Sequence, residues 1–344
     1  MQSEKQNLER RSVARVLISV SDKSAIDAFS RSLVKNGIEI VSTGGTSKIL
    51  SENGIAMTPV EDVTKFPEMM DGRVKTLHPL IFGGILARDS DKSEIEQYNI
   101  GIIDMVVCNL YPFGDAASKD VDMDALIEEI DIGGPSLLRA AAKNHARVAV
   151  VTDPSDYDWI SKEIEAGGLN LEQRRQLALK AFRHTAEYDT IIQNELSSRF
   201  DEEDLPPSLH IAGVGSPPLR YGENPHQSAI FYSDTSVQGP CVSNSTQIQG
   251  KQLSYNNLLD FDTALTMVME FEEPTAIIVK HNNPCGAASA SGLSEAYKLA
   301  VKTDPQSAFG GIVVFNREVD EDLSKSVISM FKEGVIAPSF TSAA

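Results

Sequence analysis

Hydrophobic and polar positions along the chain follow two different spacings, and the two alternate. Short apolar runs that are rich in β-branched residues predict buried strands. These runs lie at residues 13–20, 38–41, 102–109 and 148–152. After the first run, Ile26, Phe29 and Leu33 share the spacing of one helix face, and Gly37 can end that helix. Strands that alternate with helices predict an α/β domain with a mainly parallel sheet, covered on both faces.

Further helices are predicted where periodic apolar residues follow a turn or a strand. They lie between the turn at 43–46 and Asn53, at 135–143 and at 171–200, the last as one long helix or a helix pair. The composition changes at 201–218, where acidic residues and two Pro-Pro pairs predict a linker. We therefore place one domain at 1–200 and a second at 219–344.

The second domain has its own alternation of elements. Its pattern predicts helices at 257–271 and 294–302 and strands at 276–279 and 312–315. A short apolar run at 335–337 follows, with no obvious closing element after it. We therefore expect this domain to be incomplete.

The composition excludes some classes of binding partner and indicates the cellular compartment. The formal net charge of −18 makes nucleic acid and anionic membranes unlikely partners, because like charges repel. No apolar run is long enough to span a membrane, and the polar N-terminus does not resemble a secretion signal. Three cysteines spaced far apart argue against a disulfide framework, so we expect a cytoplasmic protein.

An anionic ligand of such an acidic protein must meet a locally basic pocket. In a parallel α/β sheet, that pocket is expected beyond the carboxyl ends of the strands. Ser21, Asp22 and Lys23 follow the first predicted strand. The turn Thr43-Gly44-Gly45-Thr46 follows the second and opens a helix, so its amides can face a phosphate. The alternative for this turn is an ordinary connection between a strand and a helix.

The tract Arg73-Val74-Lys75-Thr76 is the strongest candidate for an anion site. If it is extended, Arg73 and Lys75 point to the same side, where a guanidinium and an ammonium can bind one phosphate. The alternative is a solvated edge strand. His78, which stands before a proline, is more typical of a structural position than of a catalytic one.

Two further segments end or follow predicted strands. Cys108, Asn109 and Tyr111 stand at the end of one strand, where a tyrosine hydroxyl could transfer a proton, although Cys108 and Tyr111 could equally be core residues. The segment Asp131-Ile132-Gly133-Gly134 precedes a helix and allows close approach of the backbone to a ligand. Lys143 falls in the last turn of that helix, where a capping role is the alternative.

The second domain holds two polar clusters. Arg220 and Tyr221 lie in a predicted loop, which could also be an ordinary polar loop. Lys280 and His281 follow a predicted strand, where a general base could stand beside a charge stabiliser. The Pro284-Cys285 pair is similar to a zinc deaminase motif, but Ala288 replaces the second cysteine and no His-x-Glu precedes it, so we expect no metal.

Taken together, these motifs resemble one family. The tracts are Ser-Val-Ser-Asp-Lys, Thr-Gly-Gly-Thr, Phe-Pro-Glu-Met, Gly-Arg-Val-Lys-Thr-Leu-His-Pro, Cys-Asn-Leu-Tyr-Pro-Phe and Asp-Ile-Gly-Gly-Pro with Leu-Leu-Arg-Ala-Ala-Ala-Lys-Asn-His. They resemble, in order, the bifunctional purine-biosynthesis family that joins AICAR transformylase to IMP cyclohydrolase. AICAR is 5-aminoimidazole-4-carboxamide ribotide. Since the motifs fill residues 13–200, chance similarity is an unsatisfactory explanation.

The resemblance implies a methylglyoxal-synthase-like three-layer domain that closes the ring of formyl-AICAR to IMP with loss of water. It implies nucleotide contacts at Ser21, Asp22, Lys23, Thr43, Gly44, Gly45, Thr46, Arg73, Val74, Thr76, Cys108, Asn109, Ile132, Gly133 and Gly134. It implies that Lys143 donates or accepts a proton, and that Lys75, Tyr111 and Asp131 assist. No cofactor is expected for this reaction.

For the second domain, the resemblance implies part of a cytidine-deaminase-like transformylase domain, with 10-formyltetrahydrofolate as cosubstrate. His281 matches the general base and Lys280 the stabiliser of the transition state, while Arg220, Tyr221, Gly310 and Glu333 match nucleotide contacts. We expect the formyl transfer to be lost or weak if the domain is incomplete. Family members are homodimers, which is the expected partnership here.

Two other functions remain open. Methylglyoxal-synthase-like domains also serve as units that sense phosphorylated ligands, and methylglyoxal synthase itself is a lyase acting on a triose phosphate. Lys75, Tyr111 and Lys143 favour catalysis, because phosphate binding alone needs no proton-transfer groups on three segments. The transformylase-like second domain argues against the lyase.

Overall fold

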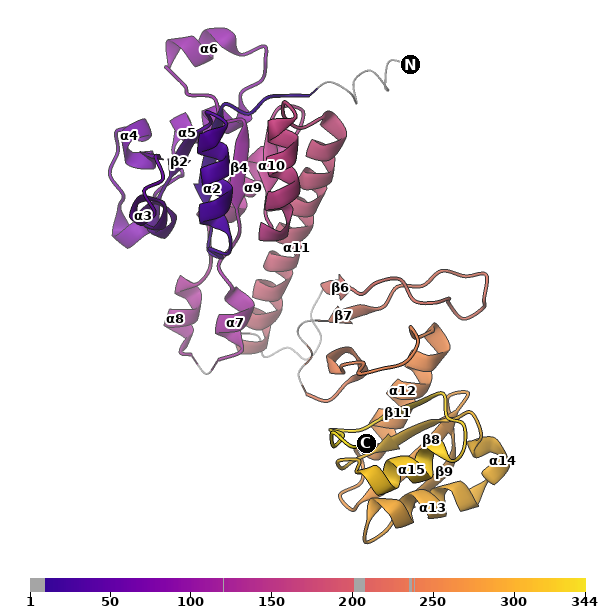
Figure 1. Cartoon of the computed structure of the whole chain (residues 1–344). Helices are drawn as coiled ribbons and strands as arrows, with labels where there is room; N and C mark the ends of the chain where they lie inside the picture. The colour runs from indigo at the N-terminus through magenta and orange to yellow at the C-terminus, as the bar shows by residue number, and fades with distance from the viewer. Residues whose placement is uncertain (1–9, 120, 201–207, 235–236, 238) are drawn as a thin grey trace. The chain divides into compact units, whose positions relative to one another are not determined.

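The computed structural model describes residues 10–119, 121–200, 208–234, 237 and 239–344 (Figure 1). Backbone contacts divide the chain into two compact units, Met1–His210 and Ile211–Ala344. Each unit has its own sheet and its own core. The division falls within the segment 201–218 that the composition predicts as a linker, of which residues 201–207 lie outside the described part.

Unit 1 is built on a parallel sheet of five strands in the order β3-β2-β1-β4-β5. The strands are β1 (Arg15–Ser19), β2 (Glu39–Ser42), β3 (Thr58–Pro59), β4 (Met105–Cys108) and β5 (Ala149–Val151). All four residues of β4 are buried, as expected of a central strand that is covered on both faces. The four predicted strands are confirmed, and β3 was too short for its hydrophobic pattern to be recognised.

The helices of unit 1 surround this sheet. They are α2 (Ile26–Lys35), α3 (Gly44–Glu52), α4 (Val60–Thr64), α5 (Pro79–Leu86), α6 (Lys92–Gln97), α7 (Phe113–Ala117), α8 (Met123–Glu128), α9 (Gly133–Lys143), α10 (Tyr157–Glu165) and α11 (Leu171–Phe200). Two 3₁₀ turns, η1 (Met70–Gly72) and η2 (Pro154–Asp156), complete it. The predicted long helix at 171–200 is therefore one continuous helix of 30 residues, shown as α11 in Figure 1.

The strand order determines where a ligand can bind. From β1 the chain moves through α2 to β2 on one side, whereas β4 and β5 lie on the other side of β1. Crossovers of one hand then place α2 and α9 on opposite faces of the sheet. The direction reverses between β1 and β4, so the loops after these two strands diverge and leave a crevice at their carboxyl ends. This confirms the predicted α/β class and indicates the location of the site.

Arg147 connects α5 to the start of β4 and β5. The side chain is buried and donates hydrogen bonds to the carbonyl oxygens at the C-terminal end of α5, where helix carbonyls lack partners of their own. The acceptors are Gly84 (2.7 Å), Ile85 (3.2 Å) and Ala87 (2.9 Å), together with Ile103 (3.0 Å) in the segment before β4. Arg147 thus joins the C-terminal end of α5 to the segment before β4.

Unit 2 has a mixed sheet in the order β11-β10-β8-β9 and a separate pair, β6 with β7. The strands are β6 (Gly213–Gly215), β7 (Tyr232–Asp234), β8 (Thr275–Lys280), β9 (Asn283–Ser289), β10 (Ile312–Phe315) and β11 (Gly334–Ile336). The helices are α12 (Tyr255–Val268), α13 (Leu293–Thr303), α14 (Pro305–Ala308) and α15 (Glu321–Ile328), with the 3₁₀ turn η3 (Val242–Asn244). Alternate residues of β8 face α12 on one side and α13 on the other, which forms two core layers.

Three strands of unit 2, β6, β7 and β9, occur where the pattern predicts none. β6 lies inside the predicted linker, because three exposed residues give no hydrophobic signal. β9 contains Pro284, which argues against a central strand, but β9 is an edge strand and an edge tolerates proline. The segment after β8 is therefore a hairpin.

Replacement of Arg147 by Met should destabilise unit 1 by about 3–5 kcal/mol, since four buried carbonyls lose their donor and Asp104 loses its ion pair. Urea unfolding followed by the fluorescence of Trp159, the one tryptophan of the chain, reports on this unit. The control is Arg175→Met, which removes a half-exposed arginine from α11. A loss below about 1 kcal/mol for Arg147→Met would show that the cap is not needed.

Candidate functional site

The end of β4 holds the loop that follows β1. The Asn109 side chain is buried, and its Oδ1 accepts hydrogen bonds from the backbone N–H groups of Ser21 (2.6 Å) and Asp22 (2.8 Å). Its Nδ2 donates to the Asp22 carbonyl at 3.3 Å. Both ends of the Asn109 side-chain amide therefore form hydrogen bonds with the backbone of this loop. The sequence predicts that Asn109 contacts the ligand, whereas in the structure its side chain stabilises the loop. Asp22 in turn accepts a hydrogen bond from the backbone N–H of Ser24, which lowers the pKa of its carboxyl.

Lys23 projects from this loop towards α3. Its Nζ contacts the Val20 carbonyl and lies 3.2 Å from Thr46 Oγ1. Thr46 also exchanges two hydrogen bonds of 3.1 Å with the backbone of Val20, which ties α3 to the end of β1. Burial lowers the pKa of Lys23, and no ion pair joins it to a carboxylate among the described residues. A half-buried ammonium of this kind gains most from an anionic ligand.

The N-terminus of α3 faces the same space. Thr43 precedes the helix in an extended conformation, and its buried Oγ1 has no hydrogen-bond partner among the described residues. Gly44 has a φ of +55°, and a Cβ added to it would lie 3.1 Å from Lys75 Nζ. A cation thus stands beside the first turn of the helix. The amides of this helix start, the Thr43 hydroxyl and two ammonium groups are the kinds of group that an anion could contact here.

The Arg73–Thr76 tract is not extended, which corrects the predicted arrangement of its two cations. Met70 and Gly72 have positive φ angles of 55° and 92°, so the chain turns sharply before Arg73. Arg73 then pairs with Glu128 of α8 at the surface, with both side chains about 60% exposed. Lys75 turns inward and lies 3.1 Å from Glu68 Oε1. The two cations therefore diverge, and Lys75 alone lies beside α3.

Asp131 closes the other side of the crevice. Its Oδ1 accepts a hydrogen bond of 2.8 Å from the N–H of Gly134, in the first turn of α9. A Cβ on Gly134 would lie 2.2 Å from Asp131 Oδ2, so only glycine fits there. Burial raises the pKa of Asp131, against the opposing effect of the Gly134 and Gly133 amides. This carboxyl can therefore exchange a proton closer to neutral pH than an ordinary aspartate.

Thr76 and Cys108 connect Asp131 to the rest of the crevice. Thr76 Oγ1 is 3.3 Å from the position of a Cβ on Gly133, so the tract reaches the start of α9. Cys108 Sγ lies 4.0 Å from the carbonyl of Gly134. Full burial raises the pKa of the Cys108 thiol, with Asp131 adding to the effect. Cys108 stays a neutral thiol and does not supply a nucleophile.

The structure thus brings most of the predicted residues of unit 1 to one edge of the sheet. At this edge lie Ser21, Asp22, Lys23, Thr43, Gly44, Gly45, Thr46, Lys75, Thr76, Cys108, Asn109, Asp131, Ile132, Gly133 and Gly134. Tyr111 follows β4 at the same edge and is 47% exposed. Val74 uses its backbone in a bridge to Met69.

Lys143 is not brought to this group. It is the last of the 11 residues of α9, about 15 Å along the helix axis from Gly133, and it is exposed. The rise of a straight helix separates the two ends of α9, so among the described residues of one chain Lys143 has no contact with Lys75, Tyr111 or Asp131. Its part in proton transfer stays a prediction.

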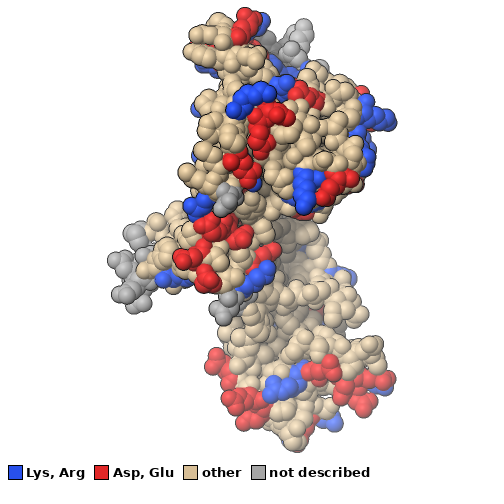
Figure 2. Space-filling model, turned by 90° about the vertical axis from the view of Figure 1, so that its left-hand side faces the viewer, with Lys and Arg blue, Asp and Glu red and all other residues tan. Residues whose placement is uncertain are grey.

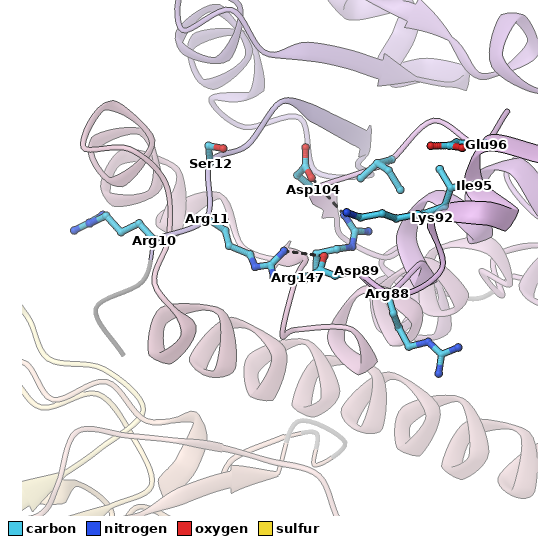
Figure 3. A pocket seen from close by; sticks show the side chains of 11 residues that line it. Arg10, Arg11, Ser12, Arg88, Asp89, Lys92, Ile95, Glu96, Asp104 and Arg147 are labelled. Atoms are coloured by element: carbon cyan, nitrogen blue, oxygen red, sulfur yellow. Dashed lines mark hydrogen bonds and ion pairs between the residues drawn. The ribbon is translucent and has the colours of Figure 1, made fainter. Parts of the chain in front are cut away.

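A hollow of about 540 Å³ lies at the opposite edge, beside the amino ends of β1 and β4 (Figure 3). It contains more cations than carboxylates, but its arginines already have partners. Arg11 pairs with Asp89, as the dashed line in Figure 3 shows, and Arg88 pairs with Asp91. Arg147 is used on α5. We conclude that this hollow is a structural network of ion pairs, remote from the crevice at the carboxyl edge.

In unit 2, His281 and Asn282 form the two-residue turn between β8 and β9. Both have positive φ angles, 52° and 63°, as in a type I′ hairpin, where asparagine and glycine are the usual residues. The N–H of Asn282 donates to Asp260 Oδ1 of α12 at 2.6 Å. A positive φ is uncommon for residues other than glycine, although histidine and asparagine adopt it more often than most, and such positions cluster at functional sites.

Lysines hold a loop close to that turn. Lys280 Nζ donates to the carbonyl of Phe309 at 2.8 Å, and Lys332 Nζ donates to the carbonyl of Ala308 at 2.6 Å. Gly310 follows with a φ of +73°, where glycine is favoured. Glu333 meets this loop through its backbone N–H, which donates to Gly311 at 3.2 Å, while its side chain is exposed.

Arg220 and Tyr221 lie at the start of α12, at the surface. The guanidinium of Arg220 stands 5.0 Å from the centre of the Tyr221 ring. The carbonyl of Tyr221 accepts a hydrogen bond from Tyr255, the first residue of α12. The same helix carries Asp260, so α12 connects the two predicted clusters of unit 2.

Three residues with a clear place in these sites carry no signal in the sequence. Glu68 lies in a recognised motif, but its pairing with Lys75 depends on the turn at Met70. Lys332 reaches the loop after α14 from a segment with no motif. Tyr188 of α11 contacts Asp131, 57 residues away in the chain. Contacts of this range have no local pattern.

Charges of both signs share the surface. Acidic and basic side chains are interspersed on the face shown in Figure 2. Within the described part of the chain, no helix is long and apolar enough to cross a membrane. Among the same residues, no three His, Cys, Asp or Glu side chains gather as a metal ion would require.

The doubly wound parallel sheet defines unit 1 as an α/β domain, with polar and cationic side chains gathered at its carboxyl edge. Comparison with protein families refines this class. An MGS-like domain matches residues 25–136, and the AICARFT/IMPCHase bienzyme matches residues 141–344, which is more than half of the chain. The chain belongs to the AICARFT/IMPCHase bienzyme family, and is thus an enzyme of purine biosynthesis.

One similar solved structure is named "Crystal structure of ForH". It is 36% identical to this chain, and the match covers 54% of this chain and 100% of that one. The TM-score is 0.49. The family assignment rests on the sequence matches.

Replacement of Glu68 by Gln should tighten the binding of a nucleoside monophosphate such as IMP by about 3–10-fold. The change removes a negative charge beside Lys75, which an anion must otherwise displace. Glu128→Gln is the matched control, since it frees the other cation of the tract at the surface and should change affinity less than about twofold. Calorimetric titration measures both. Weaker binding to Glu68→Gln would show that Lys75 does not contact the anion.

Proposed function

We propose that unit 1 is an IMP cyclohydrolase, which closes the ring of formyl-AICAR to IMP with loss of water. The observation that carries the proposal is one crevice with two different ends. One end holds a seat for a phosphate, made by Lys23, Lys75 and the start of α3. The other holds Asp131, a half-buried carboxyl whose pKa is raised by burial. A phosphorylated substrate anchored at the first end can present its base to the second.

The reaction fits these groups. The carboxamide nitrogen attacks the formyl carbon and forms the new C–N bond, while the formyl oxygen gains a proton. The carboxamide nitrogen loses one of its two protons in this step. The oxygen then leaves as water with a second proton, which comes from the formamide nitrogen as the C=N bond of the ring forms. Lys75 can stabilise the charge that develops on the oxygen, and Asp131 can carry a proton between nitrogen and oxygen. Holding the two reacting groups folded together supplies much of the rate.

Within one chain, we assign the proton transfers to Lys75, Asp131 and Tyr111. Tyr111 follows β4 at the same edge, where its exposed hydroxyl can exchange with water. Lys143 stands at the far end of α9 and closes the last turn of that helix, where a cation is favourable. A sensor of phosphorylated ligands needs no proton-transfer group at Asp131. A triose-phosphate lyase does need a base, and the match of residues 141–344 to the bienzyme argues against that alternative.

For unit 2 we propose a part in formyl transfer from 10-formyltetrahydrofolate to AICAR. The observation in favour is His281, exposed in a strained turn next to Lys280. In this reaction the bond between the formyl carbon and the folate nitrogen breaks, and a bond to the AICAR amine forms. His281 would take the proton that the amine loses, and Lys280 would stabilise the oxyanion.

The same proposal includes the setting of the enzyme. Its partners would be formyl-AICAR, IMP and AICAR, and the chain would act as a homodimer in the cytoplasm. Cys108, Cys241 and Cys285 are free thiols, which fits a reducing compartment. The acidic net charge fits the choice of small nucleotides over nucleic acid, because only a local cationic seat can attract an anion here.

The purified chain should convert formyl-AICAR to IMP, measured by absorbance. Asp131→Asn should lower kcat by about 100-fold or more while IMP affinity changes little, since the phosphate seat is separate from this carboxyl. Lys75→Met should weaken both binding and turnover.

Two controls remove the same groups elsewhere. The first is Asp124→Asn, at an exposed position of α8. The second is Lys92→Met, at the edge of the sheet opposite the candidate site. Both should retain wild-type turnover. IMP binding without any turnover by the wild-type chain would contradict the enzyme and favour the sensor. Turnover of dihydroxyacetone phosphate would instead favour the lyase.

A further inference from the structure

We infer that Tyr188 of α11 is a positioning residue that sets the place of Asp131 in the crevice. The inference rests on the proposed cyclohydrolase function of unit 1. It concerns a residue that no motif of the crevice contains, and it assigns to α11 a role beyond packing.

The contact is made through the backbone of Asp131. The Asp131 N–H donates a hydrogen bond of 2.8 Å to Tyr188 Oη. The same hydroxyl donates to the carbonyl of Glu129 at 3.3 Å. A single hydroxyl thus fixes the chain on both sides of Ile130, between α8 and α9.

The ring of Tyr188 fixes the hydroxyl in turn. Tyr188 is 6% exposed, and its ring meets that of Phe113 edge to face, with 6.5 Å between the ring centres. Phe113 begins α7, two residues after Tyr111. Tyr188 therefore joins the loop that carries Tyr111 to the loop that carries Asp131.

Asp131 needs such support because its own surroundings are permissive. The residues that follow it include Gly133 and Gly134, whose backbones resist distortion least. Without the Tyr188 hydroxyl, the position of the carboxylate would depend on its contacts with the Gly134 and Gly133 amides. A shift of about 1 Å at a reacting group can cost about 100-fold in rate.

α11 is itself anchored to the segments on both sides of β5. Lys180 Nζ lies 2.7 Å from both Asp153 and Asp156, which follow β5. The buried side chain of Arg174 donates hydrogen bonds to the carbonyls of His145 (3.0 Å) and Ala146 (3.2 Å), just before β5. These contacts fix the position of α11 along its own axis relative to the strands, and therefore the position of Tyr188.

The family matches separate Tyr188 from Asp131. Asp131 lies in the segment that matches an MGS-like domain, and Tyr188 lies in the segment that matches the bienzyme. The support of Asp131 thus comes from the part of unit 1 beyond the MGS-like match. This favours a role in ring closure over one in phosphate binding, which the loops of the MGS-like segment and Lys23 provide.

Tyr188 does not itself transfer a proton. Burial raises the pKa of its hydroxyl to about 12, so it remains neutral, and both of its hydrogen bonds go to the backbone. Its effect must act through the position of Asp131.

The test is Tyr188→Phe, which keeps the ring and removes the hydroxyl. We expect kcat for formyl-AICAR to fall at least 10-fold, while the Kd for IMP stays within about twofold. The matched control is Thr185→Val, which removes another buried hydroxyl one turn away on the same helix. Thr185→Val should keep wild-type kcat even if it lowers the melting temperature. An unchanged kcat for Tyr188→Phe, or an equal loss for Thr185→Val, would overturn the inference.

Amide hydrogen exchange tests the same contact without any turnover. In the wild-type chain the Asp131 amide should be protected although it lies in a loop, and Tyr188→Phe should raise its exchange rate at least 10-fold. Fast exchange in the wild-type chain would overturn the inference even if the variant failed to fold. Absence of turnover in the wild-type chain would instead contradict the cyclohydrolase function, and the exchange result would still judge Tyr188.

Discussion

The hydrogen bonds from Asn109 to the loop after β1 are the interaction on which the candidate site depends. Parallel strands bring their carboxyl ends to one edge, but the loops that leave β1 and β4 run in opposite directions. Asn109 follows β4, and its Oδ1 accepts hydrogen bonds from the N–H groups of Ser21 and Asp22 after β1. These bonds connect the two loops at the point where they diverge. Lys23 is consequently directed towards α3, where it is half-buried and has no carboxylate partner in the part of the chain that the structure describes, so its charge is available to a ligand.

The rest of the crevice follows from glycines and from burial. Gly44 admits Lys75 beside the start of α3, and Gly134 admits the Asp131 carboxylate against the start of α9. Two helix N-termini therefore face one space, one with cations beside it and one with a carboxyl group. Such a division suits a substrate with a phosphate at one end and a proton-exchanging reaction at the other. The account of Tyr188 extends this division, because it places the support of the carboxyl group on α11.

The fold could be predicted from the sequence wherever buried residues form a recognisable hydrophobic pattern. The candidate site could be predicted only in part. The run at 102–109 predicts β4 because a strand covered on both faces must be apolar throughout. The direction of Arg73 could not be predicted, because it depends on the positive φ angles of Met70 and Gly72. Lys143 falls in the last turn of α9, as the helix pattern predicts, and its part in proton transfer stays a prediction. Tyr188 and Lys332 were missed because their contacts join segments far apart in the sequence.

A crystal structure of the chain with IMP would test the central claim, that the carboxyl edge between β1 and β4 is the nucleotide site of unit 1. The account predicts the phosphate at the start of α3, within hydrogen-bond distance of Lys23 and Lys75, and the base directed to Asp131. In that complex the ion pair between Glu68 and Lys75 should be broken. A nucleotide bound instead in the hollow lined by Arg88 and Lys92, at the opposite edge of the sheet, would contradict it.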